Sequence, residues 1–176
     1  HTHKDSTWKD YGQNPLKSKN RNALDSFGAS LSFSDDGNLL LIGAAGESSG
    51  ASGIYSQQDS EINDKADDNS LHSNGAAYLF VFSGSTWQQK AYIKPARYQE
   101  NILETGDKNH GDFDNDNENI KGYIQRFGGS LSLSGDGQTL AVGAAQEGSE
   151  SKGISSSGNE LQQTYDGHDS GAVYLY

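Results

Sequence analysis

The sequence predicts an all-β fold made of two copies of one unit of short antiparallel strands. Residues 27–45 read FGASLSFSDDGNLLLIGAA, and residues 127–145 repeat this pattern as FGGSLSLSGDGQTLAVGAA. The composition agrees, because 22 glycines and only 32% hydrophobic residues favour short strands joined by long, turn-rich connections. No segment sustains the periodicity of an amphipathic helix.

A hairpin is expected at the start of each copy. Residues 30–34 and 39–42 are strand-like runs on either side of the Asp-Gly pair at 36–37. This dipeptide is typical of tight hairpin turns in which both central residues take a positive φ. The second copy repeats the arrangement around the Asp-Gly pair at 136–137.

Two further strands complete each predicted unit. Residues 76–82 form the expected third strand, and residues 87–94 a fourth strand that begins the next unit. We therefore divide the chain into residues 1–82 and 83–176, each of which starts with a tryptophan strand. The second unit carries an acidic insertion at about 98–124.

Sheets of four short strands cannot bury both faces alone, and such sheets stack radially as blades. The succession of FGxSLSxSxDGxxLxxGA, GI, SGAVYLY and GSTWQQKAYIK resembles the FG-GAP repeats of integrin-like β-propellers, in the long-loop form common in bacterial surface and secreted proteins. The resemblance implies two four-stranded antiparallel propeller blades. Their ring would be completed by other chains or by missing parent sequence.

Aromatic residues that recur at matching strand positions are expected to pack the blades. They are Phe27, Phe127, Trp8 and Trp87. Because Phe27 and Phe127 both precede a glycine at the start of an alternating strand, we expect them to be buried at equivalent places between neighbouring sheets.

The predicted sheets have open edges, and an unpaired edge is a template for another strand. Residues 8–17 of one copy are therefore expected to complete the last blade of another copy, which gives a homo-oligomer built head to tail. The alternative is that a larger parent protein supplies the remaining blades. A glycan or a cell-surface protein is a further candidate partner.

The resemblance implies a non-enzymatic module, extracellular or at the cell surface, with a structural or adhesive role. The five histidines lie in polar segments without an HExxH pair, and the chain contains no GxSxG, P-loop or dinucleotide-binding pattern. We therefore predict that the chain is not an enzyme. The alternatives are a carbohydrate-binding propeller and an accessory domain of a secreted polysaccharide-active enzyme.

The charge balance narrows the class of partner. The chain has 13 basic and 24 acidic residues, and its net charge of -11 opposes binding to nucleic acid or to anionic lipid. It contains no cysteine, which excludes disulfides and thiolate metal sites. No apolar run reaches the roughly 20 residues that span a bilayer. Cations are the expected ionic partners.

The sequence DFDNDNE, which begins at residue 112, predicts a calcium site within the acidic insertion. Oxygen side chains at alternate positions converge on one cation when a loop curls around it, and calcium prefers such oxygen ligands. The predicted ligands are Asp112, Asp114, Asp116 and Glu118. The alternative is a solvated acidic loop.

Glu47 and Glu147 occupy matching places after Gly-Ala-Ala in the two copies. By resemblance to a GxxGED pattern, each is expected to bond the loop backbone or to contribute to a second cation site.

Overall fold

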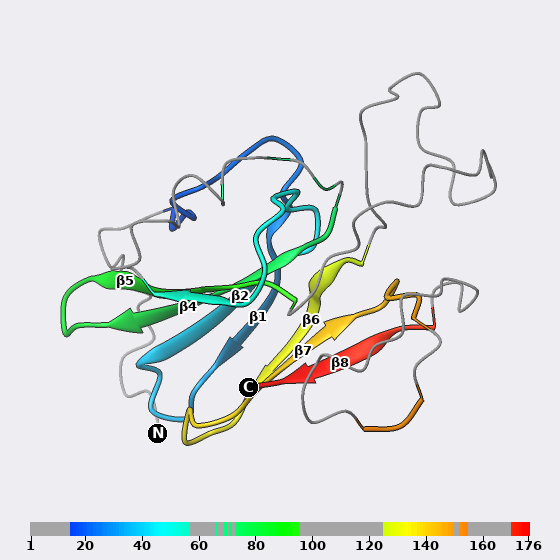
Figure 1. The fold of residues 1–176 in the computed structure, drawn as a ribbon. Helices are drawn as coiled ribbons and strands as arrows, with labels where there is room; N and C mark the ends of the chain where they lie inside the picture. The colour runs from blue at the N-terminus through cyan, green and yellow to red at the C-terminus, as the bar shows by residue number, and fades with distance from the viewer. Residues whose placement is uncertain are drawn as a thin grey trace.

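The chain is all-β, as predicted. The structure is a computed structural model that describes residues 15–56, 66, 69, 71, 73–95, 125–149, 152–154 and 170–176. Within these ranges, eight strands form two antiparallel sheets (Figure 1). The strands are β1 (Phe27–Phe33), β2 (Leu39–Ala44), β3 (Ile54–Ser56), β4 (Ala76–Phe82), β5 (Trp87–Ile93), β6 (Phe127–Leu133), β7 (Leu140–Ala144) and β8 (Ala172–Leu175).

The two copies of the sequence pattern form separate sheets. The five-stranded sheet has the order β1-β2-β4-β5-β3, and the three-stranded sheet has the order β6-β7-β8. The tryptophan strand β5 therefore joins the sheet of the strands that precede it. The short strand β3 pairs with the outer side of β5 and was not predicted, because three residues are too few to show an alternating pattern.

Both sheets begin with the same turn around their Phe-Gly pair. Ser26 and Gly28 have φ values of 57° and 94°, and Arg126 and Gly128 have φ values of 53° and 84°. In each sheet, the pairing with the next strand then shifts register before the regular ladder begins. The Phe-Gly signature thus marks a bulged entry into the first strand, where glycine tolerates the positive φ.

The Asp-Gly hairpins differ from the tight turn that the dipeptide predicts. Gly37 has a φ of 70°, whereas Asp36 is not among the residues with a positive φ. Instead, the Asp36 carboxylate accepts hydrogen bonds from the Ser34 hydroxyl at 2.6 Å and from the Asn38 amide at 3.0 Å. These hydrogen bonds hold the pKa of Asp36 below its usual range, and Asp136 makes the equivalent contacts in the second hairpin.

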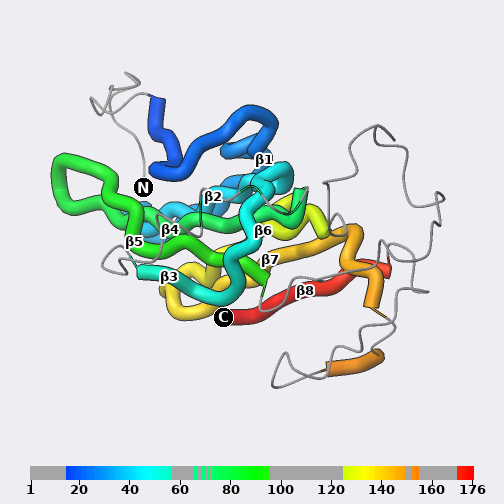
Figure 2. Tube along the Cα trace, turned by 45° about the horizontal axis from the view of Figure 1, so that its top comes forward, coloured from blue at the N-terminus to red at the C-terminus, as the bar shows by residue number. Residues whose placement is uncertain are grey.

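The two sheets pack face to face. We call the side of each sheet that carries its phenylalanine, Phe27 or Phe127, the front face, and the opposite side the back face. The front face of the three-stranded sheet lies against the back face of the five-stranded sheet, with β6 beside β1 and β2 (Figure 2). The side chains buried between them are Leu41, Ala77, Ile93, Phe127, Val142 and Ala144.

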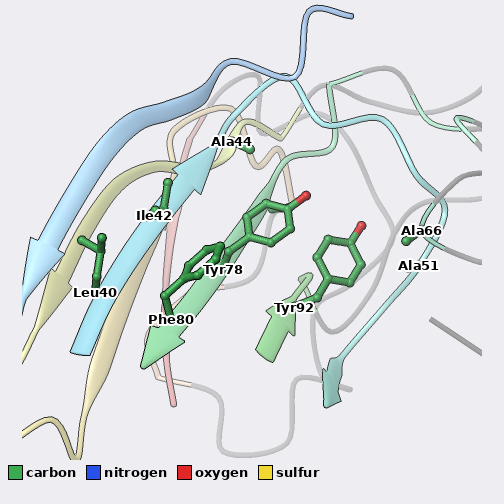
Figure 3. Packing of buried hydrophobic residues seen from close by; sticks show 9 residues of the cluster. Leu40, Ile42, Ala44, Ala51, Ala66, Tyr78, Phe80 and Tyr92 are labelled. Carbon is green, nitrogen blue, oxygen red and sulfur yellow. The ribbon is translucent and has the colours of Figure 1, made fainter. Parts of the chain in front are cut away.

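A second core lies on the front face of the five-stranded sheet. It contains the two tyrosines Tyr78 and Tyr92 beside aliphatic residues of β2 and loop alanines (Figure 3). Its buried members are Leu40, Ile42, Ala44, Ala51, Ala66, Ala76, Tyr78, Phe80 and Tyr92. Phe27 is half-buried at the margin of this core.

Glycines allow the backbones of the two sheets to meet at one end. A Cβ on Gly128 would overlap the carbonyl oxygen of Ala76, and a Cβ on Gly75 would overlap the backbone of Phe127. The Ser30 hydroxyl also donates a hydrogen bond of 2.7 Å to the Gly128 carbonyl oxygen. The glycine of the second Phe-Gly pair is therefore needed for sheet packing as well as for its φ.

Replacing Gly128 with alanine is expected to destabilise the fold more than the same change at Gly28. Both residues have a positive φ, so each change should cost about 1 to 2 kcal/mol from backbone strain. A Cβ on Gly28 meets no atom within 4 Å, whereas one on Gly128 overlaps Ala76. Urea unfolding of the two variants measures the difference, and equal losses would show that the sheets do not approach each other here.

Candidate functional site

The matching carboxylates Glu47 and Glu147 take the same position after the second strand of each sheet. The Glu47 carboxylate accepts a hydrogen bond from the Ser49 amide at 3.2 Å, and the Glu147 carboxylate accepts one from the Ser149 amide at 3.0 Å. The backbone repeats as well, because each glutamate amide donates to the carbonyl oxygen of the residue three positions earlier. Both side chains therefore turn inward and order the loop that follows.

Glu47 lies in a closed polar cluster beneath the front core of the five-stranded sheet. One carboxylate oxygen forms an ion pair with the Lys94 ammonium, and both side chains are buried. The other oxygen accepts a hydrogen bond from the Tyr92 hydroxyl at 2.9 Å, and Tyr92 is also 2.5 Å from the Ser49 hydroxyl. Glu47 thus holds β5 against the loop after β2, and the cation beside it is an ammonium group.

Two tyrosines extend this polar cluster into the core. The hydroxyls of Tyr78 and Tyr92 point the same way from neighbouring strands (Figure 3). The Tyr78 hydroxyl donates to the side-chain oxygen of Asn20 at 3.0 Å. Burial, and then the charge of Glu47, raise the pKa of both phenols above the usual range, so both remain hydrogen-bond donors at alkaline pH as well.

Asp25 adds a second acidic group near this cluster. Its carboxylate accepts a hydrogen bond of 2.7 Å from the Asn22 amide. Burial raises the pKa of Asp25, and the nearby Glu47 charge acts in the same direction, whereas the Lys94 charge opposes it. The corresponding residue of the second copy is Gln125, which carries no charge. The polar clusters of the two copies therefore differ in charge although their backbones match.

Glu147 is buried without a basic partner among the residues that the structure describes. The residue is 7% exposed, and its two carboxylate oxygens accept hydrogen bonds from the amide and the hydroxyl of Ser149, each at 3.0 Å. In the first sheet, Tyr92 of β5 and Lys94, which directly follows β5, meet Glu47. The described part of the second sheet has no strand in that place.

The expected packing residues lie at equivalent places in their sheets but differ in burial. The Phe127 ring meets the Tyr174 ring edge-on at 5.3 Å between centroids, and Phe27 meets Tyr78 in the same way at 5.3 Å. Phe127 is buried, whereas Phe27 is only half-buried, contrary to expectation, because its face has no second sheet over it in the described ranges. Trp87 packs against Phe82 at 5.2 Å.

The remaining predicted residues lie outside the described ranges. They are Trp8 and the four predicted calcium ligands Asp112, Asp114, Asp116 and Glu118. Sequence reasoning missed Lys94 and Tyr92, which complete the Glu47 cluster. Their only signal was a lysine that ends an apolar strand just before Pro95.

The buried phenols predict a loss of stability at alkaline pH. Above pH 10.0, the ordinary tyrosine pKa, the unfolded chain releases the Tyr92 proton while the folded protein retains it. The free energy of unfolding should therefore fall by about 1.4 kcal/mol per pH unit for each such tyrosine. Urea unfolding from pH 8 upward should show this slope. Tyr92→Phe should make the slope shallower by about 1.4 kcal/mol per pH unit, the contribution of one proton. Parallel slopes for the two proteins would contradict the burial of this phenol.

Among the residues that the structure describes, no helix has the length and apolar composition needed to cross a membrane. The same part of the chain contains no group of three or more side chains arranged to hold a metal ion. The chain matches no protein-family model, no curated protein and no solved structure.

Proposed function

We propose that the chain is a non-enzymatic structural or adhesive module at the cell surface or outside the cell, built from two consecutive blades of an integrin-like β-propeller. The observation that carries this proposal is the stacking of one sheet on the other. The front face of the three-stranded sheet is buried by the back face of the five-stranded sheet. The two remaining faces both carry exposed apolar side chains and have no sheet over them in the described part of the chain.

The front faces support the proposal most directly. Leu31 and Phe33 in β1 are 58% and 54% exposed. Leu131 and Leu133 occupy the equivalent positions of β6. Leu131 packs against the core between the sheets, and Leu133 is 7% exposed, with its amide donating to the Ser32 hydroxyl of β1. The β1 part of the front face of the five-stranded sheet therefore has the residues of a packed face but leaves them exposed, although the β2, β4 and β5 residues of that face are buried.

On the back faces, it is the three-stranded sheet whose apolar side chains are exposed, whereas those of the five-stranded sheet are covered. Val173 and Leu175 in β8 are 69% and 72% exposed. Their equivalents in β4 are Ala77 and Leu79, which pack against the front of the three-stranded sheet. Exposed apolar faces of this kind mark interaction surfaces. A second copy of the chain fits both open faces. The back face of its three-stranded sheet repeats the sequence of the surface that covers Phe127, and it can therefore cover Phe27 in the same way.

Sedimentation of the purified chain tests this assembly. We expect species at multiples of 18.9 kDa that increase with concentration. Leu31→Asp and Leu175→Asp should each disperse them, because both side chains are exposed and lie on the open faces. Ile154→Asp is the matched control, since Ile154 is fully exposed and lies outside the strands. A mass of 18.9 kDa at every concentration, or assembly that resists both face variants, would contradict the proposal.

Calcium binding by the acidic insertion is part of the proposed function. Four carboxylates within DFDNDNE repel one another, and a divalent cation removes this repulsion. We expect calcium to raise the melting temperature of chelator-treated protein by mass action. Asp114→Asn should reduce that increase, whereas Asp136→Asn, in a hairpin with its own hydrogen bonds, should leave it unchanged. A calorimetric titration without calcium binding would show that this loop is solvated instead.

A further inference from the structure

We propose that the polar cluster of the first sheet is a site of self-modification, in which the Lys94 amine attacks the side-chain amide of Asn20 and forms a covalent amide cross-link, with Glu47 as the proton carrier. The basis is the meeting of an amine and an amide at one buried carboxylate. The inference concerns this cluster alone and does not depend on the assembly of blades proposed above.

The Glu47 carboxylate holds the two reacting groups on its two oxygens. Its Oε2 contacts the Lys94 ammonium, and its Oε1 accepts a hydrogen bond of 3.4 Å from the Asn20 side-chain nitrogen. The side chains of Lys94 and Glu47 are 0% and 1% exposed, so water is kept away from the amine. Groups held together in this way react within one molecule and avoid the entropic cost of an encounter.

The hydrogen bonds of Asn20 fix which end of its amide faces which partner. The nitrogen donates to the Glu47 carboxylate and, at 3.3 Å, to the Ala66 carbonyl oxygen, and an ionised carboxylate and a carbonyl group only accept. The side-chain oxygen accepts a hydrogen bond of 3.0 Å from the Tyr78 hydroxyl. The leaving nitrogen therefore lies beside the carboxylate, and the carbonyl oxygen lies beside a hydroxyl donor.

Tyr78 supplies the electrophilic assistance that an amide needs. A hydroxyl that donates to an amide oxygen polarises the carbonyl group and stabilises the negative charge that develops on the oxygen during attack. Tyr78 is 0% exposed, and burial raises the pKa of its phenol well above the usual value, so the hydroxyl keeps its proton. Tyr78 is therefore placed to act on Asn20 as an oxyanion-stabilising donor.

The reaction balances with the groups of this cluster alone. The Lys94 ammonium first gives a proton to Glu47, and this transfer is less costly than in water because it removes two buried charges. The amine nitrogen then bonds to the amide carbon of Asn20, and the carbonyl electrons move onto the oxygen beside Tyr78. When the carbonyl group forms again, the bond to the original amide nitrogen breaks. Glu47 carries both protons that the amine loses to this nitrogen, which departs as an ammonium ion.

The product would join the segment before β1 to the residue after β5. Residues 20–94 include all five strands of the first sheet, so the cross-link closes that sheet into one covalent ring. Such a ring removes conformations from the unfolded chain and so stabilises the folded one. The chain contains no cysteine, and an amide bond gives the sheet a cross-link that reducing agents do not break. The reaction occurs once in each chain and is therefore not enzymatic turnover.

The second copy provides an internal comparison. Glu147 matches Glu47, but in the described ranges its carboxylate accepts hydrogen bonds from Ser149 and meets no amine. The offset that relates Glu47 to Glu147 also relates Asn20 to Ile120, which has no side-chain amide. The inference therefore applies to the first sheet, and Glu147→Gln is a matched control for changes at Glu47.

Intact mass spectrometry of the full chain under denaturing conditions tests this inference. Freshly folded protein, in which the ion pair itself is measured, should have the mass of the sequence. After incubation of the folded protein, the mass should fall by one ammonia molecule, and digestion should release one branched peptide that joins Asn20 to Lys94. An unchanged mass after prolonged incubation would overturn the inference.

A loss of ammonia elsewhere in the chain would overturn it as well. An asparagine that precedes a glycine loses ammonia when its side chain closes on the backbone, and the chain has such a pair at 74–75. A mass change that maps to the peptide containing Asn74, without a branched peptide, has this origin and excludes the cross-link as its cause.

Variants at the two reacting groups separate the cross-link from other changes in mass. Lys94→Arg keeps a cation beside Glu47 but removes the nucleophilic amine, and Asn20→Ala removes the amide. Neither variant should lose ammonia, whereas Asn22→Ala, a change at a neighbouring exposed asparagine, should react as the unchanged chain does. Circular dichroism establishes that each variant retains its strands. The same mass loss in Lys94→Arg or in Asn20→Ala would overturn the inference.

Rates of cross-linking assign the roles of the two assisting groups. Tyr78→Phe should give the same branched product at least about 100-fold more slowly, because one donor to the developing oxyanion is lost. Glu47→Gln should abolish the product, whereas Glu147→Gln should leave the rate unchanged. An unchanged rate in Tyr78→Phe would overturn the role of its hydroxyl, and an unchanged rate in Glu47→Gln would overturn the role of the carboxylate as proton carrier.

Discussion

Replacing Lys94 with methionine is expected to destabilise the chain by about 3 to 5 kcal/mol, because it leaves the buried Glu47 charge without its partner. A loss of this size is a large part of the stability of a typical domain. Urea unfolding should show it directly. The double variant Lys94→Met with Glu47→Gln should recover much of the loss, since no unpaired charge then remains.

Glu147→Gln is the matched control for this prediction. Among the described residues Glu147 has no ion pair, so removing its charge should be nearly neutral or stabilising. The glutamine side chain still accepts the hydrogen bond from the Ser149 amide. Equal losses for Glu47→Gln and Glu147→Gln would show that the two sites are electrostatically alike. That result would contradict the special role of Lys94.

Phe127→Ala should also cost about 3 to 5 kcal/mol, since its ring is fully buried between the two sheets. Phe27→Ala removes the same group from the equivalent place, but the half-buried ring should cost less, about 1 to 2 kcal/mol. The difference between the two variants measures what a covering sheet contributes. Denaturant unfolding that gives the same loss for both would mean that the sheets do not stack as described.

The loss of stability for Phe27→Ala should depend on the protein concentration. If copies of the chain associate through their faces, Phe27 becomes buried at high concentration. The loss for Phe27→Ala should then approach the loss for Phe127→Ala as the protein concentration rises. This convergence should be absent in the Leu31→Asp background.

The repeat in the sequence predicted the described strands other than β3, because each of them carries its own local signal. The Phe-Gly turn, the Asp-Gly hairpin and the alternating apolar residues are all local features, and they recur in both copies. The hairpin pairing of β1 with β2 and of β6 with β7 follows from this pattern. The φ of Asp36 did not, because its side-chain hydrogen bonds stabilise a different turn from the one that the dipeptide alone favours.

The polar cluster was less accessible to sequence reasoning. Glu47 was singled out because it has a counterpart in Glu147, but Lys94 and Tyr92 have no counterpart among the matched positions, so comparison between the copies could not find them. The half-buried state of Phe27 was missed for a related reason. Burial depends on which sheet covers a face, and equal sequences in the two copies meet different neighbours.

The stacking of one sheet on the other, front face against back face, is the central claim, and nuclear Overhauser contacts between side chains test it most directly. Leu41 belongs to the five-stranded sheet and Phe127 to the three-stranded sheet, and both lie in the core between them. We predict cross peaks between the Leu41 methyls and the Phe127 ring, and none between that ring and Leu40, which points to the opposite face. Cross peaks from Phe127 to Tyr174 and Tyr176 of its own sheet alone would contradict the stacking.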